Sequence, residues 1–386
     1  MDIEKIKEAN RHLNDVEQKS GTLFLRSKPR NVSLDLIGKC SLACTHCGVH
    51  VHGLTSGTEM SDDTYELIVS ELFPTTEVCS LGGGNYGEVT LAKKFHRVVN
   101  DCERNGISIS LTTNGTIVNS SWLSDLVRNV SVVGFSLEGM ESEYEKIRGF
   151  KWSSYLKNIE KVIGERERQG RSFPVEWRYC AHSDSISQLP DMIRRAKSMN
   201  IDRVRVMPFF PYVQSQKYKQ LFYHRSAANS VFSESRAVAR ELGVEVSIPA
   251  DFSTGTFELN QCEKAKEVTS HSGQCTVVMK KCEKPWKNMT LNELGDIRAC
   301  HILWRRMGRA YGRAGRSVHG VWNSLPYLLL RATVNRCSSN LCYRCRQPSF
   351  EGESSTANTS LLPGRKEILQ SFFTPRPKVS YIDCPA

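Results

Sequence analysis

The sequence predicts an α/β protein whose main domain is a partial barrel of six parallel strands and six helices. From residue 31 onward, short β-branched segments alternate with longer helical patterns. This alternation is typical of right-handed βαβ units and a parallel sheet. Polar and glycine-rich segments follow the strands, as in barrels whose function lies in the loops after the strands. The chain of 386 residues is long enough for one large core and a smaller domain.

The predicted elements follow one another at regular spacing. In the first helix, Ser61 is a plausible N-cap, and Leu67, Ile68 and Leu72 have the spacing of one buried face. A further short apolar segment, 244–248, follows the last helix. The predicted strands are residues 32–37, 77–81, 107–112, 132–137, 175–180 and 203–207. The predicted helices are residues 61–72, 91–104, 119–129, 152–169, 187–199 and 226–242.

Composition along the chain predicts four parts. Residues 1–25 form an amphipathic helix and a connector, and residues 26–250 form the barrel. The alternation then stops, and residues 251–350 are rich in Cys, Arg and Gly, which indicates a small second domain. Residues 351–386 form a polar tail that we expect to be mobile.

The overall composition limits the expected cell compartment and the expected classes of binding partner. No apolar segment approaches the roughly 20 residues that a membrane helix needs. The charged N-terminus lacks the apolar core of a signal peptide, so we expect a cytoplasmic protein with no membrane partner. The net charge is +11, with a local source in five arginines, and no aromatic-interleaved pattern accompanies it, so nucleic acid is not the expected partner. The five are Arg305, Arg306, Arg309, Arg313 and Arg316.

Three cysteines directly follow the first predicted strand in the pattern C-x3-C-x2-C, namely Cys40, Cys44 and Cys47. Closely spaced thiolates favour an iron–sulfur cluster or zinc. Three ligands leave one position open, which suits a cubane whose fourth iron binds another molecule. The alternative is a structural zinc site completed by a nearby histidine. The candidates are His46, His50 and His52.

Unusual residues also follow the other strands. Because the carboxyl ends of parallel strands lie at one edge of a sheet, we expect these segments to form one site. The glycine-rich loop could bring backbone close to a ligand, or be only a tight turn. The segments are 82–88 after strand two, 112–115 after strand three, 136–139 after strand four, 180–182 after strand five and 207–209 after strand six.

With these motifs the sequence resembles the radical S-adenosylmethionine (SAM) enzymes. In that family the pattern C-x3-C-x-aromatic-C binds a [4Fe–4S] cluster, and His46 occupies the aromatic position here. The resemblance implies that SAM chelates the open iron and is cleaved by one electron from the cluster. The 5′-deoxyadenosyl radical that results abstracts hydrogen from the substrate. An external donor such as flavodoxin or ferredoxin would supply the electron.

The resemblance also implies which residues hold SAM. Glu88 occupies the place of the glutamate that holds the amino group, although Val89 replaces the proline found in many relatives. Ser136 and Arg148 are candidates for the SAM carboxylate, or else a strand-end cap and a surface ion pair, and Glu138 takes the acidic place after strand four. The full predicted set is Tyr86, Gly87, Glu88, Asn114, Ser136 and Arg148.

The late cysteines resemble the SPASM and shorter twitch extensions of radical SAM enzymes. Cys282 and Cys300 flank Gly295 in the signature C-x(9–15)-G-x4-C. The resemblance implies one auxiliary [4Fe–4S] cluster, and a structural zinc ribbon is the alternative. The predicted ligands are Cys282, Cys300, Cys342 and Cys345. Cys337 could replace one of them, and Cys262 and Cys275 could complete a second cluster only outside the family's order.

Two kinds of chemistry are open. An auxiliary cluster that accepts an electron would support net oxidation, whereas epimerisation needs a hydrogen-atom donor on the opposite face of the substrate. Cys180 ends the fifth predicted strand and is the candidate donor; the alternative is a buried small hydrophobe. We expect a small polar substrate, a sugar or aminocyclitol, since no segment here matches a peptide-recognition domain. A ribosomal-peptide maturase and a metal-stabilised nucleic-acid-binding protein are the alternatives.

Overall fold

The computed structural model describes residues 2–51, 53, 55–82, 87–209, 211, 214–252, 282–300, 308–309 and 317–334. Its described strands form one ten-stranded sheet in the order β10-β9-β8-β1-β2-β3-β4-β5-β6-β7. Pairing is parallel from β8 through β7, and β9 and β10 join as antiparallel strands. The strands run through Asn31–Leu34 (β1), Val78–Leu81 (β2), Ser108–Thr113 (β3), Val130–Leu137 (β4), Val175–Ala181 (β5), Arg203–Pro208 (β6), Glu245–Ser247 (β7), Asn288–Leu291 (β8), Asp296–Arg298 (β9) and Gly308–Arg309 (β10).

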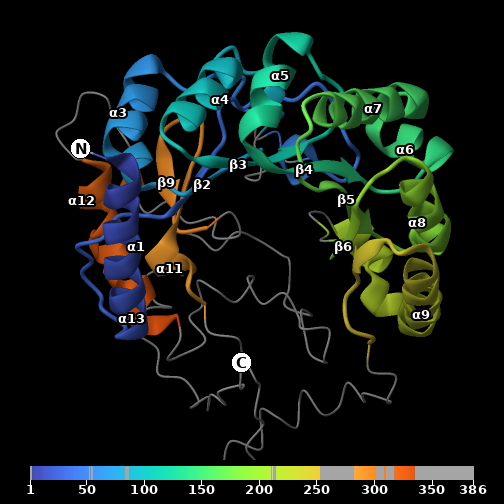
Figure 1. Ribbon diagram of the computed structural model, residues 1–386. Coiled ribbons are helices and arrows are strands. Elements are labelled where there is room, and N and C mark those ends of the chain that lie inside the picture. The colour runs from blue at the N-terminus through green and yellow to red at the C-terminus, as the bar shows by residue number, and fades with distance from the viewer. Residues whose placement is uncertain are drawn as a thin grey trace, which may run out of the picture.

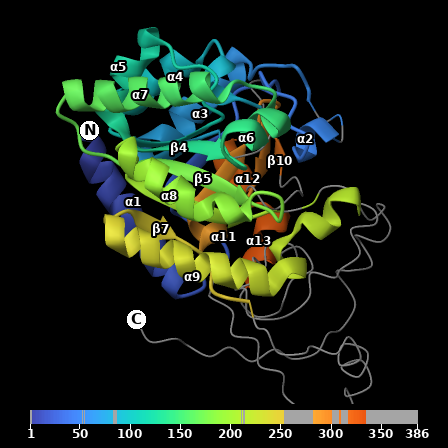
Figure 2. The ribbon, with the colours of Figure 1, turned by 90° about the vertical axis from the view of Figure 1, so that its right-hand side faces the viewer.

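The sheet curves into an arc with helices on its outer side (Figure 1). Helices α8 and α9 lie side by side and cover β6 and β7 (Figure 2). The helices are α1 (Ile3–Lys19), α2 (Gly48–Val51), α3 (Asp62–Leu72), α4 (Phe95–Arg104), α5 (Ser120–Asn129), α6 (Glu141–Arg148), α7 (Trp152–Arg168), α8 (Leu189–Ser198), α9 (Arg225–Leu242), α11 (Lys284–Lys287), α12 (Val318–Trp322) and α13 (Leu325–Thr333).

Local sequence explains where individual helices begin and end. Ser61 caps α3, because its hydroxyl accepts a hydrogen bond from the Thr64 amide at 3.2 Å. Helix α9 ends at Gly243, whose φ of +64° is a left-handed conformation that glycine adopts without strain. Both termini agree with the sequence patterns.

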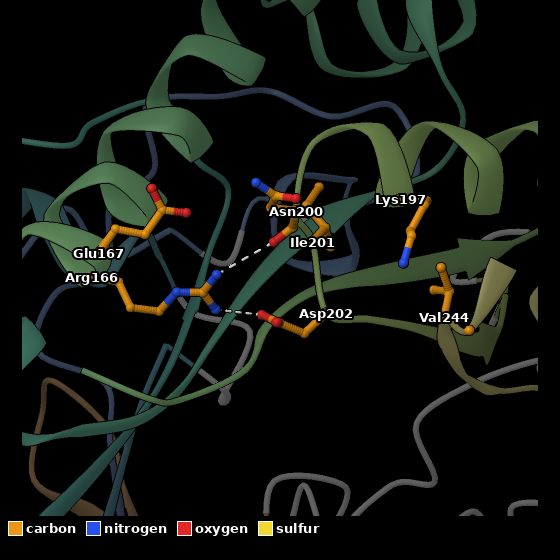
Figure 3. Close-up of a pocket in the computed structure, with 8 residues that line it drawn as sticks. Arg166, Glu167, Lys197, Asn200, Ile201, Asp202 and Val244 are labelled. Atoms are coloured by element: carbon orange, nitrogen blue, oxygen red, sulfur yellow. Dashed lines mark hydrogen bonds and ion pairs between the residues drawn. The ribbon is translucent and has the colours of Figure 1, made fainter. Parts of the chain in front are cut away.

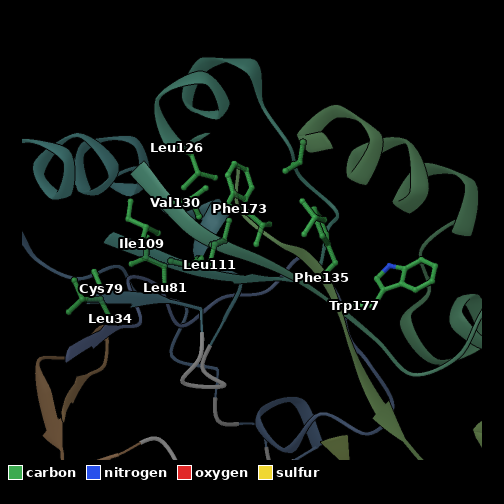
Figure 4. Packing of buried hydrophobic residues seen from close by; sticks show 14 of the residues in the cluster. Leu34, Cys79, Leu81, Ile109, Leu111, Leu126, Val130, Phe135, Phe173 and Trp177 are labelled. Atoms are coloured by element: carbon green, nitrogen blue, oxygen red, sulfur yellow. The ribbon is translucent and has the colours of Figure 1, made fainter. Parts of the chain in front are cut away.

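The hydrophobic core lies between the sheet and the outer helices. Alternate residues of strands β1 to β6 are buried on this side, such as Leu111 in β3, Phe135 in β4 and Trp177 in β5 (Figure 4). The side chain of Trp177 lies 6.1 Å from that of Trp152 in α7, measured between ring centroids. The other residues of the same strands therefore face the concave side, which we call the inner face.

The inner face is polar. In consecutive register across β8, β1, β2 and β3 stand the hydroxyl residues Thr290, Ser33, Ser80 and Ser110. On the other side of the arc the inner residues of β5 and β6 include charged side chains, among them Glu176 and Arg178, followed by Cys180 and Met207 toward the carboxyl edge. A substrate that lies against this face would meet hydrogen-bonding groups and charges.

The C-terminal elements continue the same sheet and pack on the N-terminal helix. Strand β8 pairs with β1, and the side-chain amide of Asn14 in α1 donates to the Trp286 carbonyl at 2.8 Å. The indole of Trp322 in α12 donates to the Ser27 carbonyl at 3.1 Å. The boundary predicted near residue 250 stays a prediction, because residues 253–281 lie outside the described residues. Residues 282–300, however, are joined to the barrel through β8.

The predicted fold class is confirmed, a parallel α/β sheet of the partial-barrel type. The six predicted strands correspond to β1–β6 and the six predicted helices to α3, α4, α5, α7, α8 and α9, with ends that differ by up to four residues. The sequence patterns did not predict β8–β10, nor the helices α2, α6, α11, α12 and α13. In the part of the chain that is described, none of the helices has the length and apolar character needed to cross a membrane.

Candidate functional site

The cysteine loop lies where β1 ends, between that strand and α2. Cys44 is buried, and Cys40 and Cys47 are partly exposed. The loop is held by backbone hydrogen bonds, from the Cys47 amide to the Cys44 carbonyl at 3.1 Å and from the Thr45 amide to the Ile147 carbonyl in α6 at 3.2 Å. The loop is therefore tied to α6 through Thr45 and closed on itself by the bond between Cys47 and Cys44.

Gly87 packs directly against the start of this loop. A Cβ atom at Gly87 would lie 2.3 Å from the Ile37 carbonyl oxygen and 2.5 Å from that of Lys39. Next to it, the Glu88 amide donates to the Lys39 carbonyl at 2.9 Å. The segment after β2 and the segment after β1 thus touch through their backbones, which only glycine allows at position 87.

The carboxylate of Glu88 is buried and joins the end of β2 to the end of β3. It accepts hydrogen bonds from the Thr113 hydroxyl and the Thr90 hydroxyl, both at 2.8 Å, and from the Asn114 amide at 2.7 Å. These three contacts are structural, so a SAM amino group would share a carboxylate that already has partners. The SAM-binding role of Glu88 stays a prediction.

Two hydrogen-bond donors point at the sulfur of Cys40. The Asn114 side-chain amide and the Leu42 backbone amide each lie 3.4 Å from Cys40 Sγ. Hydrogen bonds to ligand sulfurs tune iron–sulfur clusters, so these donors fit a cluster on this loop. Asn114 was predicted from the motif after β3, and its place beside Cys40 comes from the structure.

Burial raises the pKa of the Cys44 thiol to about 12 and also raises the pKa of Cys40. Without metal these thiols are therefore protonated at neutral pH, and metal binding must displace the protons. In the described ranges, no three His, Cys, Asp or Glu side chains converge closely enough for a single metal ion. A [4Fe–4S] cubane does not require the thiolates to converge on one ion, since each thiolate binds a different iron of the cluster.

Arg148 forms a buried ion pair with Glu138 at the carboxyl end of β4. Its Nε and Nη2 atoms donate to the two carboxylate oxygens at 2.6 and 2.7 Å, and both side chains are almost fully buried. Burial by itself would raise the pKa of Glu138, but this guanidinium and a further contact from His46 Nε2 at 3.2 Å outweigh it and lower the pKa to about 2. The pair with Glu138 uses Nε and Nη2 only, and the SAM-binding role of Arg148 stays a prediction.

Ser136 and Cys180 both lie on the inner face, in neighbouring strands. They alternate with Phe135 and Tyr179, which are buried on the helix side. Cys180 is paired in register with Met207 of β6. Burial, and to a lesser extent the charge of Glu138, raises the pKa of the Cys180 thiol. The thiol is therefore protonated at neutral pH.

The auxiliary-cluster signature spans α11 and the β8–β9 hairpin. Gly295 lies in the turn with a φ of +73°, and the Asn292 side chain accepts from the Asp296 amide at 2.7 Å. The antiparallel pairing of β8 with β9 returns the chain toward its starting end, so Cys282 and Cys300 flank the hairpin. Both thiols are partly exposed. The position of Gly295 in the sequence signature thus has a backbone reason.

The remaining predicted residues lie outside the described residues. They are Tyr86, Cys262, Cys275, Cys337, Cys342, Cys345, His52 and the side chains of the arginine run.

Sequence reasoning missed a contact between distant segments. Glu293 in the β8–β9 turn accepts from the Ser56 hydroxyl at 2.6 Å, and both groups border Gly38 just before the cysteine loop. In the sequence, Glu293 is a single glutamate beside a glycine turn, and no motif predicts its contact with Ser56.

A hollow of about 380 Å³ lies on the opposite edge of the sheet (Figure 3). It is lined by Arg166, Asp202 and Val244, which stand near the amino ends of β6 and β7. Arg166 and Asp202 form an ion pair at 2.5 Å. The cysteine loop, Glu88, Asn114 and Cys180 all belong to the carboxyl edge, so this hollow is separate from the candidate site.

Comparison with proteins of known sequence agrees with the site. Residues 34–166 match the sequence model of the radical SAM superfamily. The chain is 25% identical over 193 residues to a PqqA peptide cyclase of Bradyrhizobium diazoefficiens, covering 50% of this chain and 49% of that one. It is 24% identical over 189 residues to a tungsten-containing aldehyde ferredoxin oxidoreductase cofactor-modifying protein of Pyrococcus furiosus, covering 47% and 52%. The chain thus spans about half the length of these curated relatives.

Solved structures share the fold. SuiB of Streptococcus suis bound to its precursor peptide SuiA has a TM-score of 0.57 at 15% identity, covering 87% of this chain and 73% of that chain. The structure of native anSMEcpe with bound AdoMet and Cp18Cys peptide has a TM-score of 0.56 at 18% identity, covering 80% of this chain and 84% of that chain. The superfamily match covers residues 34–166, which hold the cysteine loop and the segments after β2, β3 and β4, and this part of the chain is a radical SAM domain.

Proposed function

We propose that this protein is a radical SAM oxidoreductase or epimerase that acts on a small polar substrate, a sugar or aminocyclitol. The observation that carries the proposal is the meeting of the cysteine loop with Gly87 and Asn114 at the carboxyl edge of the sheet. Cys40, Cys44 and Cys47 would hold a [4Fe–4S] cluster there. When bound, the cluster supplies the electron that cleaves SAM and so generates the 5′-deoxyadenosyl radical.

The residues of this chain would position the cofactor. Gly87 keeps the backbone after β2 close enough to the cysteine loop for both to face one ligand. Asn114 donates to the Cys40 sulfur, and Ser136 presents a hydroxyl from the inner face. Cys282 and Cys300, with Cys342 and Cys345, would hold the auxiliary cluster. An external donor of the flavodoxin or ferredoxin class would supply electrons.

The polar inner face supports a polar substrate, and Cys180 supports the epimerisation branch. The protonated thiol can give its hydrogen atom to the substrate carbon radical from the opposite face, forming a new C–H bond and breaking S–H. The thiyl radical left behind then needs one electron and one proton, which the external donor and solvent would supply. In the oxidation branch the substrate radical instead loses one electron and one proton to become a carbonyl; the auxiliary cluster would accept the electron and solvent the proton.

Ribosomal-peptide maturation is the second candidate function. A relative is a PqqA peptide cyclase, and both SuiB and anSMEcpe were solved with bound peptides. These names favour a peptide substrate for a protein with this fold. Gene context would separate the two: a neighbouring short precursor-peptide gene favours the maturase, and neighbouring glycosyltransferase or aminotransferase genes favour the sugar or aminocyclitol.

Anaerobic reconstitution with iron and sulfide tests the proposal. We expect about eight irons per chain, since two cubanes contain four each, and 5′-deoxyadenosine formation with SAM and a reductant. Replacing Cys40, Cys44 and Cys47 by Ala should remove about four irons and all SAM cleavage. Bound zinc without SAM cleavage would instead indicate a metal-stabilised nucleic-acid-binding protein and overturn the proposal.

Mass spectrometry in D2O separates the two reaction branches. Candidate sugars and aminocyclitols are incubated with the reduced, SAM-supplied enzyme. Uptake of one deuterium from solvent indicates epimerisation through an exchangeable donor such as a thiol. A loss of two mass units indicates oxidation.

A further inference from the structure

Three arginines share one buried carboxylate on the inner face of β5 and β6. Glu176 is fully buried, with 0% of its side chain exposed. Its Oε1 accepts from Arg178 Nε at 2.7 Å, and its Oε2 accepts from Arg203 Nη1 at 3.2 Å. Arg205 Nη2 approaches Oε2 only to 3.6 Å, which is longer than a hydrogen bond.

The three guanidiniums are unequally neutralised. Arg203 has a second carboxylate partner, Glu245, at 2.7 Å. Arg178 also donates to the Thr112 hydroxyl and lies over Gly134, where a Cβ would clash with its guanidinium. Counting these five charged residues, the cluster carries three positive and two negative charges. The excess positive charge lies with Arg205, which has the weakest ion pair of the three.

Arg205 is also the most accessible of the three. Its side chain is 45% exposed, against 14% for Arg178 and 23% for Arg203. The guanidinium has five donors in a planar fork that matches a carboxylate or a phosphate. Arg178 is thus held in place by Glu176 and Thr112, whereas the guanidinium of Arg205 is exposed and can bind an anion.

Arg178 and Arg205 lie next to Cys180, the candidate hydrogen-atom donor, on the inner face. Arg178 and Arg205 are partners in register, and the next inner pair toward the carboxyl edge is Cys180 with Met207. Two residues along a strand span roughly 7 Å. Ser136 stands opposite Arg178 on β4. An anionic group held by Arg205 would therefore lie a few bonds from a carbon that faces Cys180.

We propose that Arg205, with Arg178 beside it, binds an anionic group of the substrate, a carboxylate or a phosphate. The Ser136 hydroxyl faces the same region. The inference rests on the proposed function, because it takes the inner face as the substrate side. It narrows the substrate class from polar to acidic.

Binding of simple anions to the reconstituted holoenzyme tests the site. The probes are inorganic phosphate, glucose 6-phosphate and glucuronate, with glucose as the neutral reference, measured anaerobically by titration calorimetry. We expect at least one anion to bind and glucose not to bind. The phosphate and glucuronate arms distinguish the two anionic groups. Arg205→Gln should weaken the anion about tenfold, and Arg205→Lys should weaken it less, since the charge remains.

Arg195→Gln is the matched control, because Arg195 is an exposed arginine of α8 on the outer side. It should leave anion binding unchanged. Three results would each overturn the inference: no binding of any anion, binding of glucose as tight as that of its anionic derivatives, or equal binding by wild type and Arg205→Gln. Wild-type 5′-deoxyadenosine formation is measured separately. Its absence contradicts the proposed function and not the anion site.

Discussion

Single atoms decide how closely the loops of the candidate site approach one another. The hydrogen of Gly87 occupies a place where a methyl group would meet two backbone carbonyl oxygens and the Lys39 nitrogen at less than 3 Å. Backbone atoms cannot turn aside as a flexible side chain can. Position 87 therefore couples the glycine-rich segment to the cysteine loop.

Gly87→Ala should displace the loop that carries Cys40. We expect a loss of about four irons after reconstitution, with loss of SAM cleavage, measured by iron analysis and 5′-deoxyadenosine formation. Gly164→Ala is the control, since nothing lies within 4 Å of its added Cβ in α7. It should keep full activity and gain up to about 1 kcal/mol in the free energy of unfolding. Normal iron content in Gly87→Ala would contradict the coupling.

Cys180→Ala should abolish product formation and spare 5′-deoxyadenosine formation, if the thiol donates a hydrogen atom to the substrate. The reason is that abstraction still occurs, while the carbon radical has no S–H on the other face. Cys102→Ala is the control, because Cys102 is a fully buried core thiol of α4. Unchanged product in Cys180→Ala would exclude the donor role and favour oxidation.

Secondary-structure elements are joined at the site by buried polar pairs. The Glu138–Arg148 pair links the end of β4 to the end of α6, and His46 of the cysteine loop contacts the same carboxylate. The carboxylate of Glu88 links the ends of β2 and β3. The carboxyl edge of the sheet is thus fixed by specific contacts that a purely apolar packing would not provide.

Glu138→Gln should lower the free energy of unfolding by about 3–5 kcal/mol, because it leaves Arg148 buried without a carboxylate. Glu165→Gln breaks an ion pair with Arg168 on the surface of α7 and should cost less than about 1 kcal/mol. Urea denaturation at pH 7 measures both. Equal losses of unfolding free energy in the two variants would show that the buried ion pair stabilises the fold no more than the surface pair does.

The same pair predicts a pH dependence of stability. The folded pKa of Glu138, about 2, is below its ordinary value near 4.5, so the unfolded chain takes up the proton first. The contribution is complete above pH 4.5 and is lost as the pH falls toward 2. Urea denaturation from pH 7 to pH 3 should show a smaller decline in Glu138→Gln than in wild type. Parallel declines would contradict this assignment.

Across the whole molecule, the two ends of the described chain meet. Trp322 is fully buried, lies 5.0 Å from Tyr327 between ring centroids and has the Arg331 guanidinium 4.5 Å above its ring. Arg331 in turn donates to the Leu23 and Pro285 carbonyls at 2.8 and 2.9 Å. From these contacts and the β1–β8 pairing we expect the described C-terminal elements to unfold together with the barrel.

Trp322→Ala should therefore lower the stability of the whole barrel by about 3–5 kcal/mol in one transition. Coincident curves from circular dichroism and tryptophan fluorescence would establish this. The exposed Leu325→Ala in α13 serves as the control and should change little, since its side chain is 67% exposed. Two separated transitions would mean that the C-terminal elements unfold on their own.

The sequence by itself determined the βα alternation, the cysteine triplet and the grouping of functional segments at one edge. These depend on local patterns: β-branched strands, Ser61 as a cap, and the rule that parallel strands end together. Only the tertiary structure decided that β8 extends the sheet, that Arg148 is paired with Glu138, and that Arg178 and Arg205 share the inner face with Cys180. Each of these depends on which distant segments become neighbours in the folded chain. The spacing of residues within one segment does not determine which segments pair.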